Sequence, residues 1–478
     1  MPGADAYDRL PYTDHAYAES HPDRLSVVAR LARWAPPEIA TARVLELGCG
    51  RGGNMLPMAA GLPGGSFVGV DRSGRQVGTA RNIARSTGLT NVAFVEGDFA
   101  TDAPAPGSWD FVVAHGVCSW VSPESRCALL RSVARAMSPG ALAYVSLNVL
   151  PGWYERMAAR DWLRAHRTEG PQEALAWLRE HVSPELGDVR RRLDAVLRRL
   201  AETDAAYTAH EYLSDEHHPQ LVRDHLREAR EAGLTYVGDA IPGETALEML
   251  PGAVRERAAT LDVDAAQELV DFVRNSAFRR SVFVRTDEAN RRGWRWSGEL
   301  SVGGLDGVRV ASRLRPHGPP VDDAPSERFD GLDVSVSIAD PGARRALRIL
   351  AELAPLALPL DELTRRSVAE GPGLRTEIFD LWLATGAVDL HAHAPALASA
   401  TSLRPRACPV ARWHAANGGP LTNRWHQEVR IDDPVLRALL ANMTGDHDIA
   451  AIAHAVGTSE RIAGAAVSAA AAAALLEE

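Results

Sequence analysis

The sequence contains no lysine, because all 52 of its Lys and Arg residues are arginine. Three kinds of chemistry that depend on a lysine amine are therefore excluded. These are a Schiff base to a pyridoxal cofactor, a P-loop that binds nucleotide phosphates, and a lysine general base.

Cysteine is scarce, and histidine is not grouped at ligand spacing. The four cysteines are far apart, with no C-x-x-C, so we expect neither a disulfide framework nor a zinc site. The pairs His217-His218 and His391/His393 have no nearby Cys and no paired acids at ligand spacing. We therefore interpret them as surface histidines and expect no metal.

Long apolar runs are also absent. No stretch approaches the roughly 20 residues that span a bilayer, and the start, MPGADAYDRLPY, lacks the basic and apolar regions of a secretory signal. We expect a cytoplasmic protein without membrane contact. The net charge of −10 argues against a nucleic-acid partner. The 478 residues suffice for two to four domains.

Strand and helix signals alternate in the first third of the chain, as they do in parallel α/β sheets. Helical periods separate the apolar runs, and the last of these helices is expected from Ser122 to Pro139-Gly140. The expected strands are 43–48, 66–71, 92–98, 109–116 and 141–148.

The pattern of helix and strand signals changes twice after these strands. Residues 153–230 read as Arg-rich helices, and strand signals return at 233–240 and 279–285. We interpret the first segment as a helical insertion and the two strands as the completion of the same sheet. Helices at 341–354, 359–368 and 373–385, followed by AVDLHAH, suggest a winged-helix-like module.

A glycine turn follows the first expected strand in VLELGCGRGGN (44–54), where Gly48, Gly50 and Gly53 fit the dinucleotide pattern G-x-G-x-x-G. Glu46, two residues before the turn, argues against a dinucleotide, because its charge would repel the pyrophosphate. S-adenosylmethionine carries a sulfonium and an ammonium and no phosphate. The helix start near Asn54 is placed to direct N–H groups at its carboxylate.

Two further acids end the next strands. Asp71 is placed to accept both ribose hydroxyls, and Asp98, beside Phe99, to accept the adenine amino group while the ring packs on the base. Three acids at three successive strand ends are typical of a class I methyltransferase. The predicted fold is therefore an α/β, Rossmann-like class I methyltransferase domain with S-adenosyl-L-methionine as cofactor.

Several longer segments resemble one family, the bacterial methyltransferases that carry a methyltransferase regulatory domain, which include rickettsial lysine methyltransferases that modify outer-membrane protein. The segments that carry the resemblance are YDRLPYTDHAYAESHPDRL, VLELGCGRGGN, VGVDRSGRQV, AHGVCSWV, VSLNVLPGWY, HEYLSDEHHPQL, EAGLTYVGDA, DFVRNSAFRRSVF, RPRACPVARW and LTNRWHQEV.

The resemblance implies a homodimer and a set of cofactor contacts. Those contacts are Glu46, Gly48, Gly50, Asp71, Asp98 and Phe99, with Arg72 and Gln76 flanking the ribose acid. The chain departs from the family at Cys118 and Leu147, both of which we expect to line the acceptor pocket.

The expected domains are five. They are a cofactor-binding core with an N-terminal lid (1–152), the helical insertion (153–230), the sheet completion (231–288), a middle domain (289–400) and a C-terminal helical domain (401–478).

Residues after the fourth and fifth strands, together with the N-terminal lid, are the candidates for the acceptor site. His115 is placed either as proton acceptor or as a cofactor or structural hydrogen bond. Asn148 is placed to accept a hydrogen bond from an amine. Tyr12 joins these two as a catalytic candidate, and the expected substrate contacts are Tyr7, Tyr12, His15, Trp120, Asn148 and Trp153.

The predicted function is N-methylation of an amine of a protein or peptide, either a lysine side chain or an N-terminus. One alternative is a natural-product O- or N-methyltransferase, favoured by the departures at Cys118 and Leu147. Another is a non-enzymatic regulator that senses S-adenosylmethionine and touches DNA, which the acidic balance disfavours.

Overall fold

A computed structural model describes residues 14–102, 105–167, 170–203, 205–319, 325–367, 373–398 and 402–477. In this part of the chain no helix is long and apolar enough to cross a membrane.

The centre of the molecule is a sheet of eight strands in the order β3-β2-β1-β4-β5-β8-β7, with β6 paired to β5. Neighbours from β3 to β5 are parallel, whereas β8 runs antiparallel to both β5 and β7. The strands are β1 Arg43–Leu47, β2 Ser66–Asp71, β3 Val92–Glu96, β4 Trp109–Ala114, β5 Met137–Leu150, β6 Gln220–Leu221, β7 Leu234–Asp239 and β8 Phe278–Arg285. The predicted α/β fold is confirmed, and the returning strands do complete the sheet.

Helices cover both faces of this sheet because neighbouring strand residues point to opposite sides. Val44 packs on one face with α2, α3 and α4, and Leu45 on the other with α5 and α10. The helices of the sheet layers and their edges are α2 Pro22–Leu31, α3 Met55–Gly61, α4 Gly74–Ser86, α5 Pro123–Ala136, α10 Val222–Glu231, α11 Gly252–Ala258, α12 Val263–Arg274 and α13 Thr286–Arg291.

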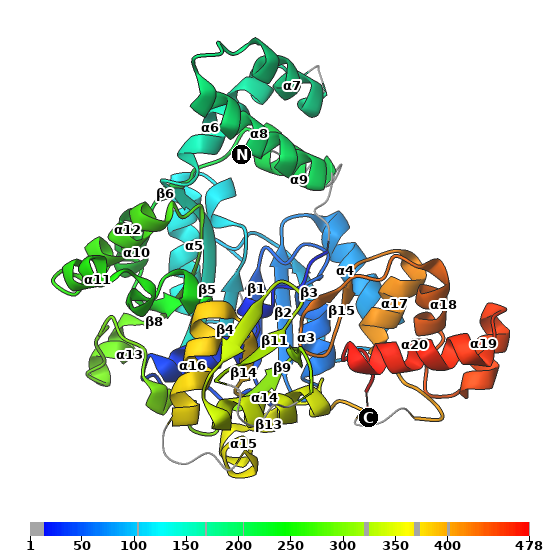
Figure 1. Cartoon of the computed structure of the whole chain (residues 1–478). Helices are drawn as coiled ribbons and strands as arrows, with labels where there is room; N and C mark the ends of the chain where they lie inside the picture. Colours follow the sequence, from blue (N-terminus) through cyan, green and yellow to red (C-terminus); the bar gives the residue numbers. More distant parts are fainter. Residues whose placement is uncertain are drawn as a thin grey trace.

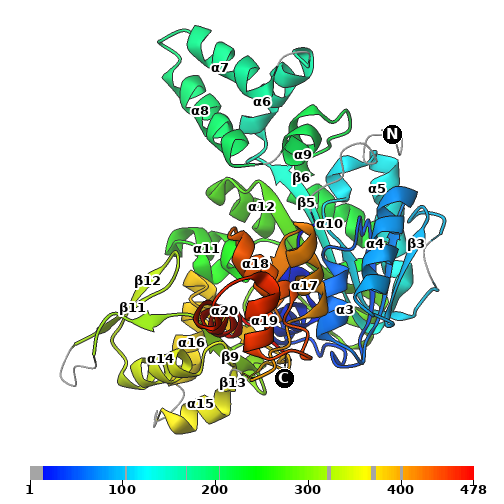
Figure 2. The same ribbon diagram turned by 90° about the vertical axis from the view of Figure 1, so that its right-hand side faces the viewer.

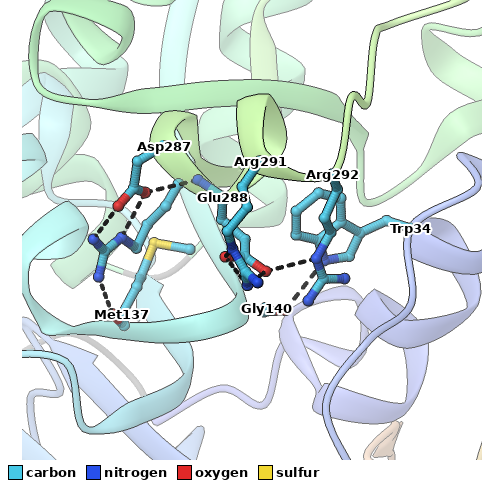
Figure 3. A network of polar contacts seen from close by, with 8 residues as sticks. Trp34, Met137, Gly140, Asp287, Glu288, Arg291 and Arg292 are labelled. Carbon is cyan, nitrogen blue, oxygen red and sulfur yellow. Dashed lines mark hydrogen bonds and ion pairs between the residues drawn. The ribbon is translucent and has the colours of Figure 1, made fainter.

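The start of β5 differs from the prediction. Helix α5 ends at Ala136, and the strand begins at once with Met137 instead of after Gly140. Gly140 adopts φ +82°, and its carbonyl accepts a hydrogen bond from Trp34 Nε1 at 3.1 Å. Arg285 donates to the carbonyl of Met137 at 3.2 Å. These contacts, drawn in Figure 3, hold the segment extended where the Pro-Gly pair suggested only a helix stop.

The insertion helices stand clear of the sheet in both ribbon views (Figures 1 and 2) and have a small core of their own. They are α6 Tyr154–Ala165, α7 Pro171–His181, α8 Gly187–Glu202, α9 Ala205–Thr208 and the π-helix η3 Ala209–Leu213.

The middle region joins two small antiparallel sheets to three helices. The helix and strand order expected for the winged-helix-like module is present from Pro341 onward. The elements are β9 Arg309–Ser312, β10 Arg315–Pro316, β11 Glu327–Asp330, β12 Ser335–Ile338, α14 Pro341–Leu353, β13 Leu358–Pro359, α15 Leu360–Arg366, α16 Gly373–Thr385 and β14 Val388–His391.

The C-terminal region shares the core of the first sheet face, because its helix α17 packs against α3 and α4 (Figure 2). The alanine-rich helix α20 buries Ala463, Ala466 and Ala470 within the chain. The elements are α17 Pro409–Asn417, β15 Leu421–Thr422, β16 Glu428–Val429, α18 Pro434–Ala441, α19 Ile449–Val456 and α20 Glu460–Ala472.

A buried ion-pair cluster joins β8 and β7 to α12. Arg279, which is fully buried, donates to Asp271 Oδ1 at 2.8 Å and to Gln267 Oε1 at 2.9 Å, and it pairs with Asp239. Removing one partner of such a pair leaves uncompensated buried charge.

We expect Arg279→Ala to lower the free energy of opening of β7 and β8 by about 3–5 kcal/mol. The measurement is hydrogen exchange of their amides. Arg291→Ala is the control, because Arg291 is 68% exposed and pairs with Glu288 within α13. It should cost less than about 1 kcal/mol, and equal effects of the two substitutions would contradict the assignment.

Candidate functional site

The carboxyl ends of the parallel strands open into a cavity of about 910 Å³. Ligands of open α/β sheets bind at this edge. We call its inner side the glycine-turn wall, formed by Glu46, Gly48, Gly50, Asp71, Arg72, Gln76 and Phe99. The outer wall is formed in part by the insertion. Its residues are Tyr17, Glu19, Arg156, Arg199, Tyr207, Glu211, Glu244, Arg274, Phe278 and Arg280.

The glycine turn is shaped by close approach and by Asp71. Gly48 has φ +81°, and a Cβ there would stand 2.5 Å from Val117 Cγ2. Gly50 N–H donates to Asp71 Oδ2 at 2.9 Å, and the other oxygen accepts from Ser73 N at 2.9 Å. Asp71 thereby holds the glycine turn and the start of α4 together, and both segments line the cavity.

Glu46 has an oxygen that lacks a partner. Its side chain is 4% exposed, and Oε1 accepts a hydrogen bond from Asn54 Nδ2 at 2.9 Å. Among the described residues, Oε2 has no hydrogen-bond partner. Burial, with the neighbouring charge of Asp71, raises the pKa of Glu46 to about 8. A buried oxygen left this way at a cavity wall is suited to a donor or cation from outside the chain.

Asn54 ties the glycine-turn wall to both ends of the described chain. Besides Glu46, its Nδ2 reaches Ser20 Oγ at 3.1 Å. Its Oδ1 accepts from Tyr17 N at 3.0 Å and from His426 Nε2 at 2.8 Å. The side chain expected to open a helix therefore brings the N-terminal segment and the C-terminal region to the cavity.

His115 lies in the cavity wall as a neutral ring. Its Nδ1 is 2.9 Å from the Tyr144 hydroxyl, and its ring stacks on Tyr17 with centroids 3.4 Å apart. Burial, with the charge of Arg280, lowers the pKa of His115 to about 3. Such a ring is a weak base at neutral pH, so the geometry favours the hydrogen-bonding alternative for His115.

An aromatic cluster supports Asn148. Asn148 and Trp120 line the cavity, whereas Trp153 is 1% exposed and does not reach it. His217 lies beside both tryptophans, with ring centroids 4.6 Å from Trp120 and 4.2 Å from Trp153. Asn148 Nδ2 donates to its Nε2 at 3.0 Å. The interpretation of His217 as a surface histidine was wrong, since it packs behind the wall.

Two more sequence interpretations need correction. Cys118 is fully buried with Leu129 in the core under α5 instead of lining the cavity, which Leu147 does line. His391 is also buried and pairs with Asp23 at 2.6 Å. The described residues hold no group of three or more His, Cys, Asp or Glu suited to a metal ion.

The remaining predicted residues are placed as follows. Asp98 accepts from Ala100 N at 2.8 Å and is not among the cavity residues, so its adenine contact stays a prediction. His15 lines the cavity, and its Nδ1 is 2.9 Å from Glu428 Oε2. Tyr7 and Tyr12 lie outside the described residues.

Sequence reasoning missed the whole outer wall, including Tyr17 and Glu211. Both lie in segments that carry the family resemblance, AYAES and HEYLS, and each is a polar residue inside a conspicuous motif. That motif membership was the available signal, but only the fold shows that both face the same cavity.

Three family models match the chain. Residues 44–140 match a methyltransferase domain, 204–285 a predicted methyltransferase regulatory domain, and 404–468 the PKMT C-terminal winged helix domain. The sheet order and the glycine turn define a class I methyltransferase domain. The chain joins it to a methyltransferase regulatory domain and a PKMT winged-helix domain, which confirms the resemblance and places a winged helix after residue 400.

Relatives in sequence and in structure include uncharacterized proteins and a solved methyltransferase structure. RP789 of Rickettsia prowazekii is 31% identical over 59% of this chain and 53% of its own length. The protein sll1526 of Synechocystis is 28% identical over 57% of each. The chain thus spans little more than half of these relatives. PKMT2 from Rickettsia typhi in complex with AdoHcy shares the fold, with a TM-score of 0.84, 19% identity and coverage of 98% and 100%.

We expect Asn54→Ala to loosen both segments that Asn54 holds, because it leaves several buried groups unpaired at about 1–3 kcal/mol each. Hydrogen exchange in 17–20 and 421–429 should quicken about tenfold or more. Asn417→Ala is the control, since Asn417 bonds within α17 to the Trp413 carbonyl. Unchanged exchange in both segments would refute the role of Asn54.

Proposed function

We propose that this chain is an S-adenosylmethionine-dependent methyltransferase that acts on lysine side chains of a protein. The observation that carries the proposal is the unpartnered Oε2 of Glu46 at the wall of a methyltransferase-domain cavity.

The residues present fit the cofactor. Its ammonium matches the free oxygen of Glu46, and its ribose hydroxyls match the carboxylate of Asp71 at the same wall. Glycine at position 48 avoids a clash of a Cβ with Val117 and lets the turn keep the positive φ with which its backbone lines the cavity. The volume of about 910 Å³ lies within the usual range of ligand cavities and is large enough for an acceptor side chain as well.

A protein acceptor is supported by two findings. One is the PKMT winged-helix match over 404–468, and the other is the shared fold with PKMT2 of Rickettsia typhi along nearly the whole chain. A homodimer, a cytoplasmic location and the absence of nucleic-acid and membrane partners belong to the same proposal.

When bound, the cofactor supplies an electrophilic methyl group on a sulfonium. The work of the chain is to align the acceptor and exclude water, which is worth up to about 7–11 kcal/mol for a well-oriented pair. Trp120 and Asn148 line the part of the cavity that we assign to the acceptor. The ring of His115 stacks on Tyr17 and holds it in the cavity wall. A lysine amine with a pKa of about 10.4 must also lose a proton.

Labelled cofactor tests the acceptor directly. With a bacterial lysate we expect label in polypeptides, lost when the lysine amines of the lysate are acetylated beforehand, and mass spectrometry should place the methyl on lysine. The chain is its own negative control because it contains no lysine. Label in small molecules alone would indicate a natural-product methyltransferase, and label that survives acetylation would exclude lysine.

Proton release tests Glu46. With a pKa of about 8, its carboxyl is mostly protonated at pH 7, and an adjacent ammonium favours the ionised form. We expect AdoHcy binding at pH 7 to release close to one proton, measured by calorimetry in buffers of different ionisation enthalpy. Glu46→Gln should abolish the release and weaken binding about 10–100-fold. Unchanged release in this variant would contradict the contact.

The raised pKa of Glu46 also determines how the stability of the unliganded chain changes with pH. Because the folded value of about 8 lies above the ordinary 4.5, Glu46 costs stability progressively as pH rises from about 4.5 to about 8. Glu46→Gln is therefore expected to unfold at a higher temperature than the unsubstituted chain at pH 8, and at a similar one at pH 4.

A further inference from the structure

The arginines of the outer wall are engaged with other groups. Arg280 pairs with Glu19 and with Glu244, each at 2.9 Å. Two of the three outer-wall carboxylates are thereby ion-paired with one guanidinium.

The other three arginines have different partners. Arg199 donates to the Tyr207 hydroxyl at 2.8 and 3.0 Å. Arg156 lies over the ring of Trp153, 5.3 Å from its centroid. Arg274 donates to a backbone carbonyl at 3.1 Å. None of these contacts occupies the third carboxylate, that of Glu211.

Glu211 is the outer-wall carboxylate without a hydrogen-bond or ion-pair partner among the described residues. It is partly buried and lies on η3, a π-helical turn, which is a feature often found at functional sites. Buried Arg160 of α6 donates to the Glu211 carbonyl at 2.7 Å and also bonds the carbonyl of Ser214. The turn is therefore fixed from its backbone while its carboxylate is left to the cavity.

Charge and burial at Glu211 suit proton exchange near neutrality. Burial raises the pKa of Glu211 to about 7, against the lowering effect of the nearby arginines. Burial also raises the pKa of Tyr17, and the charges of both Glu46 and Glu211 add to that effect. Glu19 and Asp14 contribute in the same direction, so Tyr17 lies in an acidic part of the cavity that includes both Glu46 and Glu211.

We propose that Glu211 receives the ammonium of the acceptor lysine and takes its proton before methyl transfer. The inference rests on the proposed function and names the residue that handles the acceptor. The lysine ammonium gives one proton to the carboxylate, which leaves a neutral amine and a carboxylic acid. The nitrogen lone pair then forms the N–C bond as the S–C bond of the cofactor breaks, and the proton passes from Glu211 to solvent.

The unpaired carboxylate of Glu211 favours a lysine ammonium over an alcohol as the methyl acceptor. A primary ammonium brings both a positive charge and donors, which complete the hydrogen bonding of the carboxylate. A neutral alcohol brings no charge for Glu211 to compensate.

The kinetic test uses Glu211→Gln, which keeps the shape and removes the charge. The matched control is Glu202→Gln, since Glu202 is an exposed residue at the end of α8. General-base contributions are typically about 10²–10⁴-fold. We expect Glu211→Gln to lower kcat on a lysine-containing protein about 100-fold or more at pH 7, with AdoHcy affinity unchanged. The loss of kcat should shrink as the pH approaches the pKa of the free lysine amine. In the unsubstituted chain, kcat should level off above about pH 7.

The charged or titratable groups that interact with Glu211 are Tyr17, Arg156, Arg160, Arg199, Tyr207 and Tyr212, and buried His210 adjoins it on η3. Because the substitution changes Glu211 alone, a bend that persists in Glu211→Gln would belong to one of these groups and would overturn the inference. An unchanged kcat and pH profile in Glu211→Gln would overturn the inference, as would joint loss of activity and AdoHcy affinity, which indicates a structural role.

A binding arm separates this inference from the proposed function. Calorimetry of the AdoHcy-loaded chain with a pentalysine peptide should show about tenfold weaker binding in Glu211→Gln at pH 8, and equal affinity would overturn the contact. If the unsubstituted chain transfers no methyl to lysine yet shows this difference, the proposed function fails and the cation contact stands. If transfer occurs and Glu211→Gln is unaffected, only the present inference fails.

Discussion

The hydrogen bond from Asn54 to Glu46 is the contact on which the cavity depends. It supplies a hydrogen bond to one oxygen of the buried Glu46 carboxylate, which would otherwise have no hydrogen-bond partner among the described residues. The same amide also fixes the backbone of Tyr17 and the ring of His426. Since a planar amide has few free orientations, these bonds set the cavity wall, the N-terminal segment and the C-terminal region in one arrangement.

Most of the sheet and of the glycine-turn wall follows from local patterns. Alternating strands and helices predict the parallel core, and an acid before a glycine turn predicts the site of Glu46 and Asp71, because strand ends meet at one edge. The start of β5 was not predictable, because contacts from Trp34 and Arg285, distant in sequence, override the local Pro-Gly signal.

The outer wall depends on tertiary packing and was correspondingly missed. Glu211 lies in an arginine-rich helical region whose stripes predict only packing, and a π-helical turn has no period that a sequence reveals. His217 was misread for a similar reason, since nothing near it in sequence announces that Trp120 and Trp153 enclose it. The numbers of acidic and basic residues did not help either. The outer wall contains side chains of both charges, and only the structure shows which of them are paired.

The contact between His426 and Asn54 has a thermodynamic consequence for the winged helix at 404–468. A second bond, between His15 and Glu428, crosses the same boundary. Coupling between two binding events is reciprocal. If a macromolecule that binds the winged helix alters these two bonds and thereby the affinity of the cavity for its ligand, filling the cavity changes the affinity for that macromolecule by the same factor.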